Sequence, residues 1–116
     1  MNRQHGHYRT EIRREMRGGT GQVGIEHLWE PAKEMLAPNR MAAKLTLEPG
    51  SSIGFHRHEG EEELFYIISG RAQADDNGVT VELEAGDTLL TGNGAGHSIR
   101  NIGEDTLEIL AVITRY

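Results

Sequence analysis

The chain has no cysteine, and this absence narrows the chemistry that is open to it. Disulfide bonds, thiolate ligands for a metal and a cysteine nucleophile are all excluded. Aromatic residues make up only 5% of the 116 residues, so a hydrophobic core has to be built mainly from aliphatic side chains. A chain of this length predicts a single domain with one core.

Long hydrophobic runs and an excess of positive charge are missing as well. No apolar stretch approaches the length of a membrane span, and the N-terminal sequence MNRQHGHYRTEIRREM lacks the apolar segment of a signal peptide. The formal net charge is −6, with no basic stripe, which argues against nucleic acid and anionic membrane surfaces as partners. We therefore expect a cytoplasmic protein that binds neither nucleic acid nor membranes.

Glycine, in contrast, is plentiful, with 15 residues against three prolines, which suits tight turns between short strands. Hydrophobic and polar residues alternate along several stretches, and turn signals such as Asn77-Gly78 separate them about every eight to twelve residues. Strands are predicted at residues 23–30, 41–48, 64–69, 79–83, 88–91 and 107–114. This pattern predicts an all-β sandwich or barrel.

The N-terminal residues lack the alternating pattern of the rest of the chain. Residues 1–22 are predicted to be a partly flexible extension, followed by one barrel domain at residues 23–116. Within the extension, residues 10–17 carry the start and stop signals of one or two helical turns. RGGTGQVG, residues 17–24, lacks the spacing of a phosphate-binding loop, so we expect a flexible turn there.

Candidate ligands for a metal are concentrated in GFHRHEGEEELFYIISG, residues 54–70. His56 and His58 are two residues apart, which places both imidazoles on one face of an extended chain, where two nitrogens reach a single cation. Carboxylates follow, but strand alternation does not choose between Glu62 and Glu63, because apolar residues alternate with each of them and both faces look buried.

Two spaced patterns are more specific than this pair of histidines. The first is Gly50-x5-His56-x-His58-x4-Glu63-x6-Gly70, and the second is Gly86-x5-Gly92-x-Gly94-x2-His97-x3-Asn101. Together they resemble the two signature motifs of the cupin superfamily at nine of ten fixed positions, with Gly92 standing where the second motif has proline. The alternating stretches on both sides of the motifs also fit the barrel of that family.

The resemblance implies a double-stranded β-helix, or jelly-roll, barrel with one divalent metal inside. Its ligands would be His56, His58 and Glu63 from the first motif and His97 from the second. Three imidazoles and a carboxylate suit Mn, Fe, Co, Ni, Cu or Zn better than Ca, and the resemblance favours manganese. A divalent ion with one carboxylate leaves about one positive charge, so we expect a small anion as the ligand of the metal.

Further residues are assigned to the surroundings of this site. Phe65 and Ile67, which alternate with Glu63, and Ile99, which alternates with His97, are predicted to line the cavity, although plain core is an equally good interpretation of Phe65 and Ile67. Three glutamates of the same segment, Glu59, Glu61 and Glu62, are expected in solvent.

Three other positions receive structural interpretations. His27 is expected to be a packed histidine rather than a ligand. Asn101 is expected to order its loop through backbone hydrogen bonds. Gly92 in place of proline is expected to leave the loop before His97 looser. No residue is assigned a catalytic role.

The favoured function is a metal-dependent enzyme, of decarboxylase or dioxygenase type, that acts on a small carboxylate. RGGTG, LEPGSSIGFHRHEGEEE and GHSIRN resemble the small single-domain cupins called oxalate-decarboxylase-like. However, the single domain and the short spacer between the motifs, with no insertion to build a lid, depart from the two-domain oxalate decarboxylases. A non-catalytic binding or sensing module is the alternative. A sugar-phosphate isomerase is disfavoured, because no basic cluster lies inside the motifs.

A homodimer is also expected. A small barrel leaves strand edges and a partly apolar outer face, and the strand around Trp29 and the late strand at residues 107–114 are predicted to be shared across a two-fold interface.

Overall fold

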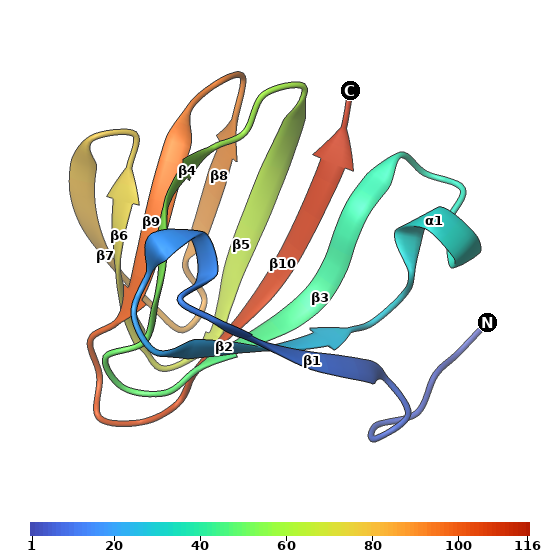
Figure 1. The fold of residues 1–116 in the computed structure, drawn as a ribbon, viewed down its shortest axis with the longest axis horizontal. Helices are drawn as coiled ribbons and strands as arrows, with labels where there is room; N and C mark the ends of the chain where they lie inside the picture. The colour runs from blue at the N-terminus through green and yellow to red at the C-terminus, as the bar shows by residue number, and fades with distance from the viewer.

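The computed structural model describes residues 1–116 as two antiparallel β-sheets that face each other (Figure 1). One sheet has six strands in the order β1-β2-β3-β10-β5-β8, and the other has four in the order β4-β9-β6-β7. The strands are β1 (Arg9–Arg14), β2 (Gln22–His27), β3 (Asn39–Leu47), β4 (Ser52–Arg57), β5 (Glu61–Ser69), β6 (Arg71–Asp76), β7 (Val79–Glu84), β8 (Thr88–Gly92), β9 (Gly96–Asn101) and β10 (Leu107–Arg115). The predicted all-β jelly-roll fold is confirmed.

Helical structure is limited to α1 (Pro31–Glu34) and one 3₁₀ turn, η1 (Met16–Gly18). Neither could cross a membrane, because no helix in the structure is long and apolar enough. The Asn77-Gly78 hairpin is also confirmed. Asp76 pairs with Val79 across it, and φ is 48° at Asn77 and 97° at Gly78, as a primed turn requires.

The core lies between the sheets and consists mainly of aliphatic side chains. Leu45 on β3, Ile67 on β5 and Ile109 on β10 are each at most 1% exposed, because alternate residues of a strand point to one face. Strand β10 is central to the six-stranded sheet, since it pairs with β3 on one side and β5 on the other. Because both of its edges are paired, β10 could take part in the predicted two-fold interface only through the outer face of the sheet.

The N-terminal segment forms a strand where a helix was expected. Residues Arg9–Arg14 pair antiparallel with β2 and extend the six-stranded sheet, and only the short turn η1 follows them. In Figure 1, β1 crosses the lower part of the molecule and η1 lies in front of β4. A strand forms here in place of the predicted helical turns, because pairing with β2 satisfies the backbone hydrogen-bonding groups of this segment. Tertiary context overrides a weak helix propensity.

The two faces of β5 differ, contrary to the expectation that both are buried. Glu63, Phe65 and Ile67 point inward and are at most 4% exposed, whereas Leu64 and Tyr66 are 38% and 42% exposed on the outer face. The strand reads as continuously apolar because its outward side chains are also apolar. Alternation thus places Glu63, and not Glu62, between the sheets.

Asn101 closes the loop between β9 and β10, as expected from the sequence. Its Nδ2 donates to the carbonyls of Leu47 and Asp105, each at 2.8 Å, and its Oδ1 accepts from the backbone N–H of Gly103 at 2.8 Å. The side chain is 1% exposed. Removing it would leave buried polar groups without partners, which costs more than the hydrogen bonds themselves contribute.

We expect Asn101→Ala to lower the free energy of unfolding by about 3 kcal/mol, because several buried partners are left unpaired at once. Urea unfolding followed by circular dichroism measures the change. Asn2→Ala, at an exposed asparagine, is the matched control and should change the stability by less than about 0.5 kcal/mol. Equal stability of the two variants would contradict the structural role of Asn101.

Candidate metal centre

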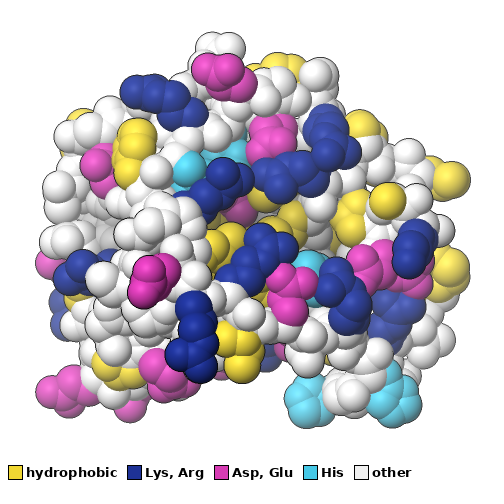
Figure 2. All heavy atoms as spheres, in the orientation of Figure 1, with side chains coloured by type: hydrophobic (Ala, Val, Ile, Leu, Met, Phe, Trp, Pro, Cys, Tyr) yellow, Lys and Arg dark blue, Asp and Glu magenta, His cyan; other side chains and the backbone are white.

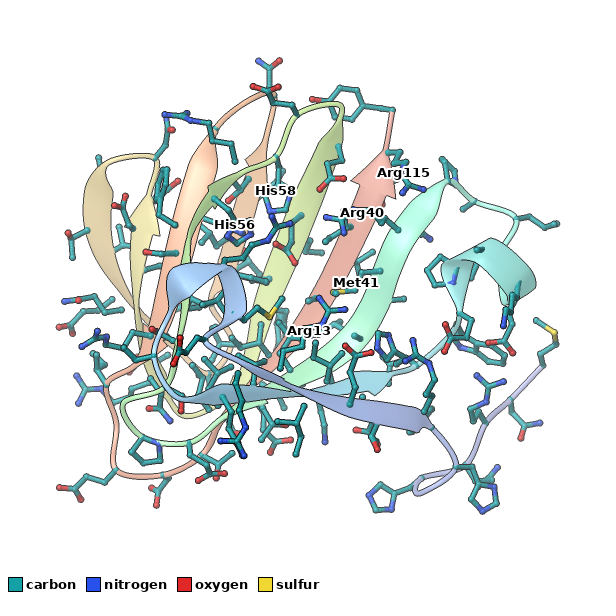
Figure 3. All side chains as sticks on the ribbon, viewed as in Figure 1. Arg13, Arg40, Met41, His56, His58 and Arg115 are labelled. Atoms are coloured by element: carbon teal, nitrogen blue, oxygen red, sulfur yellow. The ribbon has the colours of Figure 1, made fainter.

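Four side chains from two facing sheets converge at one point in the interior. They are His56 on β4, His58 directly after β4, Glu63 on β5 and His97 on β9, and one candidate ligand atom from each lies within 4.8 Å of the others. His56 and His58 are seen side by side in Figure 3, between the strands of the two sheets. The structure therefore brings together all four residues that the sequence proposed as ligands.

Strand pairing fixes this convergence. His56 lies opposite His97 in the β4–β9 pair, and the exposed neighbours Phe55 and Arg57 point outward. On the other sheet, Glu63 lies opposite Thr91 in the β5–β8 pair. Alternation along three strands thus turns four side chains toward the same interior point.

The loop before His97 is a tight turn rather than a loose one. Asn93 and Gly94 both have positive φ, at 54° and 81°, and the N–H of Ala95 donates to Gly92 O at 3.0 Å. The backbone of His58 is bonded to this turn on both sides, through Ala95 O at 3.0 Å and Gly94 N at 2.8 Å. A Cβ at position 92 would lie 2.7 Å from Glu62 Cβ, so the close approach of β5 accounts for glycine there.

Each imidazole is oriented by a partner at its Nδ1 atom. His56 Nδ1 donates to Gly54 O at 2.8 Å, and Thr91 Oγ1 lies 2.9 Å from His97 Nδ1. The third, His58 Nδ1, lies 2.6 Å from a carboxylate oxygen of Glu61. This arrangement leaves Nε2 of all three rings as the candidate ligand atoms, because a hydrogen-bond partner at one ring nitrogen of a histidine orients the other nitrogen toward a metal.

The ligand atoms are crowded and carry opposing charges. Nε2 of His58 and of His97 each lie 3.0 Å from Glu63 Oε1, and the two nitrogens are 3.1 Å apart. Burial opposes the ionisation of Glu63, but the hydrogen bonds from His58 and His97 outweigh it and lower the pKa of this carboxyl. The same contact with Glu63 raises the pKa of His58, whereas burial lowers the pKa of His56.

These donors fit a divalent transition metal. Three buried or half-buried imidazole nitrogens and one carboxylate oxygen, with no thiolate, are the ligands that Mn, Fe, Co, Ni, Cu and Zn accept. A cation at their centre would stabilise the ionised Glu63 and the neutral imidazoles at the same time.

Glu61 is part of this site and not a solvent-exposed residue, contrary to expectation. Its side chain is 13% exposed, and Arg40 on β3 donates two hydrogen bonds to it, both at 2.8 Å. The hydrogen bonds from Arg40 lower the pKa of Glu61 most, and the contact with His58 lowers it further. Together they outweigh burial, which raises this pKa, so that it falls to about 2. Glu61 therefore stays ionised and holds His58. Glu59 and Glu62 are exposed, as expected.

The sequence contained only part of the signal for this second layer. Glu61 follows His58 by three residues, across the turn at Gly60, which has φ of 69°, and this spacing could have indicated the contact. Nothing near Arg40 in the sequence points to Glu61 or to His58. Thr91 likewise reaches His97 only through the pairing of β5 with β8 and the turn that follows.

A small cavity of about 30 Å³ adjoins the candidate ligands, which is room for about two water molecules. It is lined by Arg13, Met16, Arg17, Arg40, Met41, Leu45, Ile53, His56, His58, Glu63, Phe65 and Ile113. In Figure 3, Arg13, Arg40 and Met41 lie around His56 and His58, and Figure 2 shows basic side chains gathered near the centre of this face with hydrophobic atoms between them.

Of the three residues predicted to line the cavity, only Phe65 does so. Its ring stacks on His97 at 4.9 Å between centroids, with 7° between the ring planes. Ile67 and Ile99 are at most 1% exposed and belong to the hydrophobic core instead. The N-terminal segment, which was not predicted to reach the cavity, contributes Arg13, Met16 and Arg17.

Comparison with known proteins agrees with this geometry. A model of the cupin domain family matches residues 43–113, a span that includes all four candidate ligands. The chain belongs to the cupin family. The two signature motifs and the jelly-roll sheets of this cupin are thus explained by one family assignment.

Three proteins that are similar to this cupin have oxalate in their names. The oxalate-binding protein of Thermotoga maritima is 47% identical over 98 residues, which cover 84% of this chain and 80% of the relative. The solved structure of a predicted oxalate decarboxylase from Thermotoga maritima has a TM-score of 0.94 and 41% identity, and the match covers 100% of both chains. An oxalate decarboxylase of Bacillus subtilis is 33% identical over 76 residues, but these make up only 20% of its length.

We expect Glu61→Gln to weaken the binding of Mn²⁺ by about 10- to 100-fold, because an uncharged amide orients His58 less firmly and lowers its basicity. Isothermal titration calorimetry on the metal-free protein measures the affinity. Glu62→Gln, one residue away on the exposed face, is the matched control and should bind like the wild type. If Glu61→Gln also binds like the wild type, Glu61 does not support the metal.

Proposed function

We propose that this cupin binds one divalent transition metal, manganese as the first candidate, through His56, His58, Glu63 and His97. The observation that carries the proposal is the convergence of one ligand atom from each residue within 4.8 Å. The orientation of all three imidazoles through their Nδ1 atoms supports it further. Four protein ligands leave open positions on an ion that prefers six, and these positions accept small molecules.

The molecule proposed for those positions is a small carboxylate, with oxalate as the first candidate. The metal and Glu63 together leave about one positive charge in a buried site. The arginines of the cavity lining add further attraction for an anion. The cavity of about 30 Å³ favours an anion of few atoms, and the relative that is named an oxalate-binding protein points to the same ligand.

The cavity favours binding over turnover. Breaking the carbon–carbon bond of oxalate requires a proton for the carbon that is left, and a positioned acid normally supplies it. Glu63 is the one carboxylate among the lining residues, and His56 and His58 are the histidines; all three are assigned to the metal. We therefore place the non-catalytic binding module ahead of the decarboxylase, and oxalate turnover by the metal-loaded protein would reverse this order.

The sugar-phosphate isomerase remains disfavoured, but for a different reason from the one that the sequence suggested. Basic residues do lie at the cavity, contributed by segments outside the first motif. The size of the cavity is the better argument, because a sugar phosphate is much larger than the space beside the candidate ligands.

The central experiment measures metal content and oxalate binding together. We expect the wild type to bind one Mn²⁺ per chain and to bind oxalate only when manganese is present, as seen by mass spectrometry of the metal and by calorimetry. His97→Ala should lose more than about 90% of the bound manganese, because a buried ligand cannot be replaced from elsewhere. His5→Ala, at an exposed histidine, is the control. Full metal content in His97→Ala would disprove the assigned site.

We also propose a homodimer, now through the outer face of the six-stranded sheet. Leu64 and Tyr66 on β5 are 38% and 42% exposed, and Leu90, which pairs with Leu64 from β8, is 60% exposed. Leu110 and Val112 on β10 pair with Tyr66 and Leu64, respectively, and extend this apolar patch. A contiguous apolar patch on a sheet is typical of protein–protein contact.

Replacing two residues of this patch by charges tests the dimer. We expect Leu64→Glu combined with Leu90→Glu to convert the protein from a dimer to a monomer in light scattering, because the charges would be buried without partners. Val79→Glu, at an apolar residue of β7 that is 63% exposed outside the patch, should leave the dimer intact. A monomeric wild type would remove the proposal.

A further inference from the structure

The N-terminal segment at residues 9–21, the strap, lines the cavity beside the candidate ligands through Arg13, Met16 and Arg17. It packs on β4 backbone to backbone. A Cβ at Gly19 would collide with the carbonyl of Ser52, and a Cβ at Gly54 would collide with the carbonyl of Arg17. Glycine at both positions permits this approach. The RGGTG sequence therefore serves close packing, and it is not the loose turn that was expected.

Hydrogen bonds fix the strap at this end. Thr20 N donates to Ser52 Oγ and Ser52 N donates to Thr20 O, both at 2.9 Å. Thr20 Oγ1 also donates to Gly50 O at 2.9 Å, and Glu15 N donates to Gly21 O at 2.9 Å. The strap thus closes on itself and on β4 before it leads into β2.

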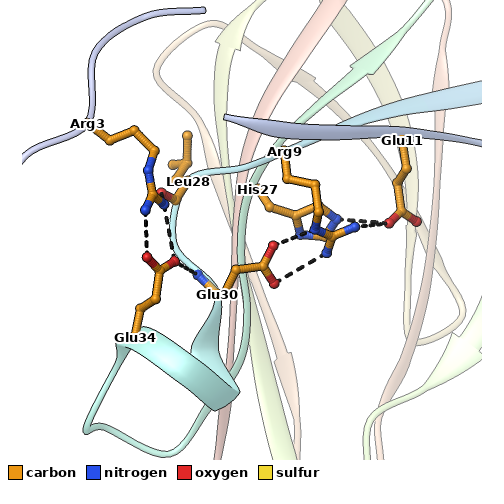
Figure 4. A network of polar contacts seen from close by, with 7 residues as sticks. All are labelled: Arg3, Arg9, Glu11, His27, Leu28, Glu30 and Glu34. Atoms are coloured by element: carbon orange, nitrogen blue, oxygen red, sulfur yellow. Dashed lines mark hydrogen bonds and ion pairs between the residues drawn. The ribbon is translucent and has the colours of Figure 1, made fainter. Parts of the chain in front are cut away.

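A network of charges anchors the other end (Figure 4). Glu11 accepts from Arg9 at 2.9 Å and Arg13 at 2.5 Å, and His27 Nε2 lies 3.1 Å from it. Arg9 continues the network to Glu30. His27 is therefore a packed histidine, as expected from the sequence, and it ties β2 to the strap.

Between these anchors the backbone of the strap is strained. Glu15 and Arg17 adopt left-handed conformations, with φ of 47° and 55°. The other two residues that do so without being glycine, Asn77 and Asn93, are asparagines in tight turns, where this conformation is common. For a glutamate or an arginine, the left-handed conformation raises the free energy of the backbone. Such strain persists where the surrounding structure imposes it, often at functional sites.

This conformation places Arg17 at the cavity as the arginine without a partner. Arg13 is paired with Glu11, and Arg40 is paired with Glu61. Arg17 lines the same cavity, and no side-chain hydrogen bond or ion pair in the structure involves its guanidinium. Arg17 is exposed, so its guanidinium is free to bind an anion that enters the cavity.

We propose that Arg17 binds the end of the anion that the metal does not hold, so that the site selects a small dianion with two neighbouring carboxylates over a monocarboxylate. This inference rests on the proposed function, since it requires an anion on the metal. A planar guanidinium matches a carboxylate with two parallel hydrogen bonds, and a ligand with a single carboxylate would already use that group on the metal. Arg17 is then a specificity residue contributed from outside both cupin motifs.

Calorimetric titration of the manganese-loaded protein with oxalate and with formate tests this role. We expect Arg17→Asn to weaken oxalate binding by about tenfold or more, since a charge-assisted pair is lost, and formate binding by less than about threefold. Asparagine tolerates the left-handed backbone, so the strap should keep its conformation. Manganese affinity and the thermal midpoint should stay unchanged.

Arg14→Asn is the matched control, because Arg14 belongs to the same strap but lines a separate surface groove with Gln22 and Glu48. It should bind both anions like the wild type. Unchanged oxalate binding in Arg17→Asn, or an equal loss of oxalate and formate, would overturn the inference and leave the proposed function standing. A manganese-loaded wild type that binds no oxalate would overturn both.

Discussion

The arrangement of polar side chains inside this barrel depends on one buried carboxylate. Glu63 is 4% exposed between two sheets, and a charge in such a place is tolerated only where other groups compensate it. His58 and His97 do so from the facing sheet, and a divalent cation would do so more fully. The pairing of β4 with β9 and of β5 with β8 therefore serves two purposes, since the same strands that build the core also bring the compensating nitrogens to the carboxylate.

Features that follow from local alternation could be predicted from the sequence. The facing of His56 and His58, the Asn77-Gly78 hairpin and the bonds of Asn101 all depend on residues close in the chain or on a familiar motif. The choice of Glu63 over Glu62 could not be derived from the pattern of β5, because an apolar outer face hides the alternation. Only the family resemblance indicated it, and the structure shows the physical reason in the different exposure of the two faces.

Features that depend on distant segments could not be predicted. Arg40 reaches Glu61 from β3, and the strap reaches the cavity from the beginning of the chain. In both cases the sequence near the residue describes an ordinary exposed arginine or a flexible terminus. The predicted helix at residues 10–17 failed for the same reason, because its backbone pairs with a strand that begins at Gln22. Long-range pairing overrides local signals most easily where those signals are weak.

The residues around the cavity fall into groups with different proposed roles, and this separation bears on function. In the proposed site the motif residues hold the metal, while Glu61 orients His58 and Arg40 holds Glu61. In this proposal, the residues that distinguish one anion from another come from the strap, which contributes Arg17 to the lining. A site of this kind can change its ligand through the strap without disturbing the metal, because Arg17 contacts neither the candidate ligands nor their partners through hydrogen bonds. If the proposed metal site is correct, Glu63 is the one carboxylate in the lining and it is a metal ligand, so chemistry on a bound anion would need a proton from outside the residues that surround it.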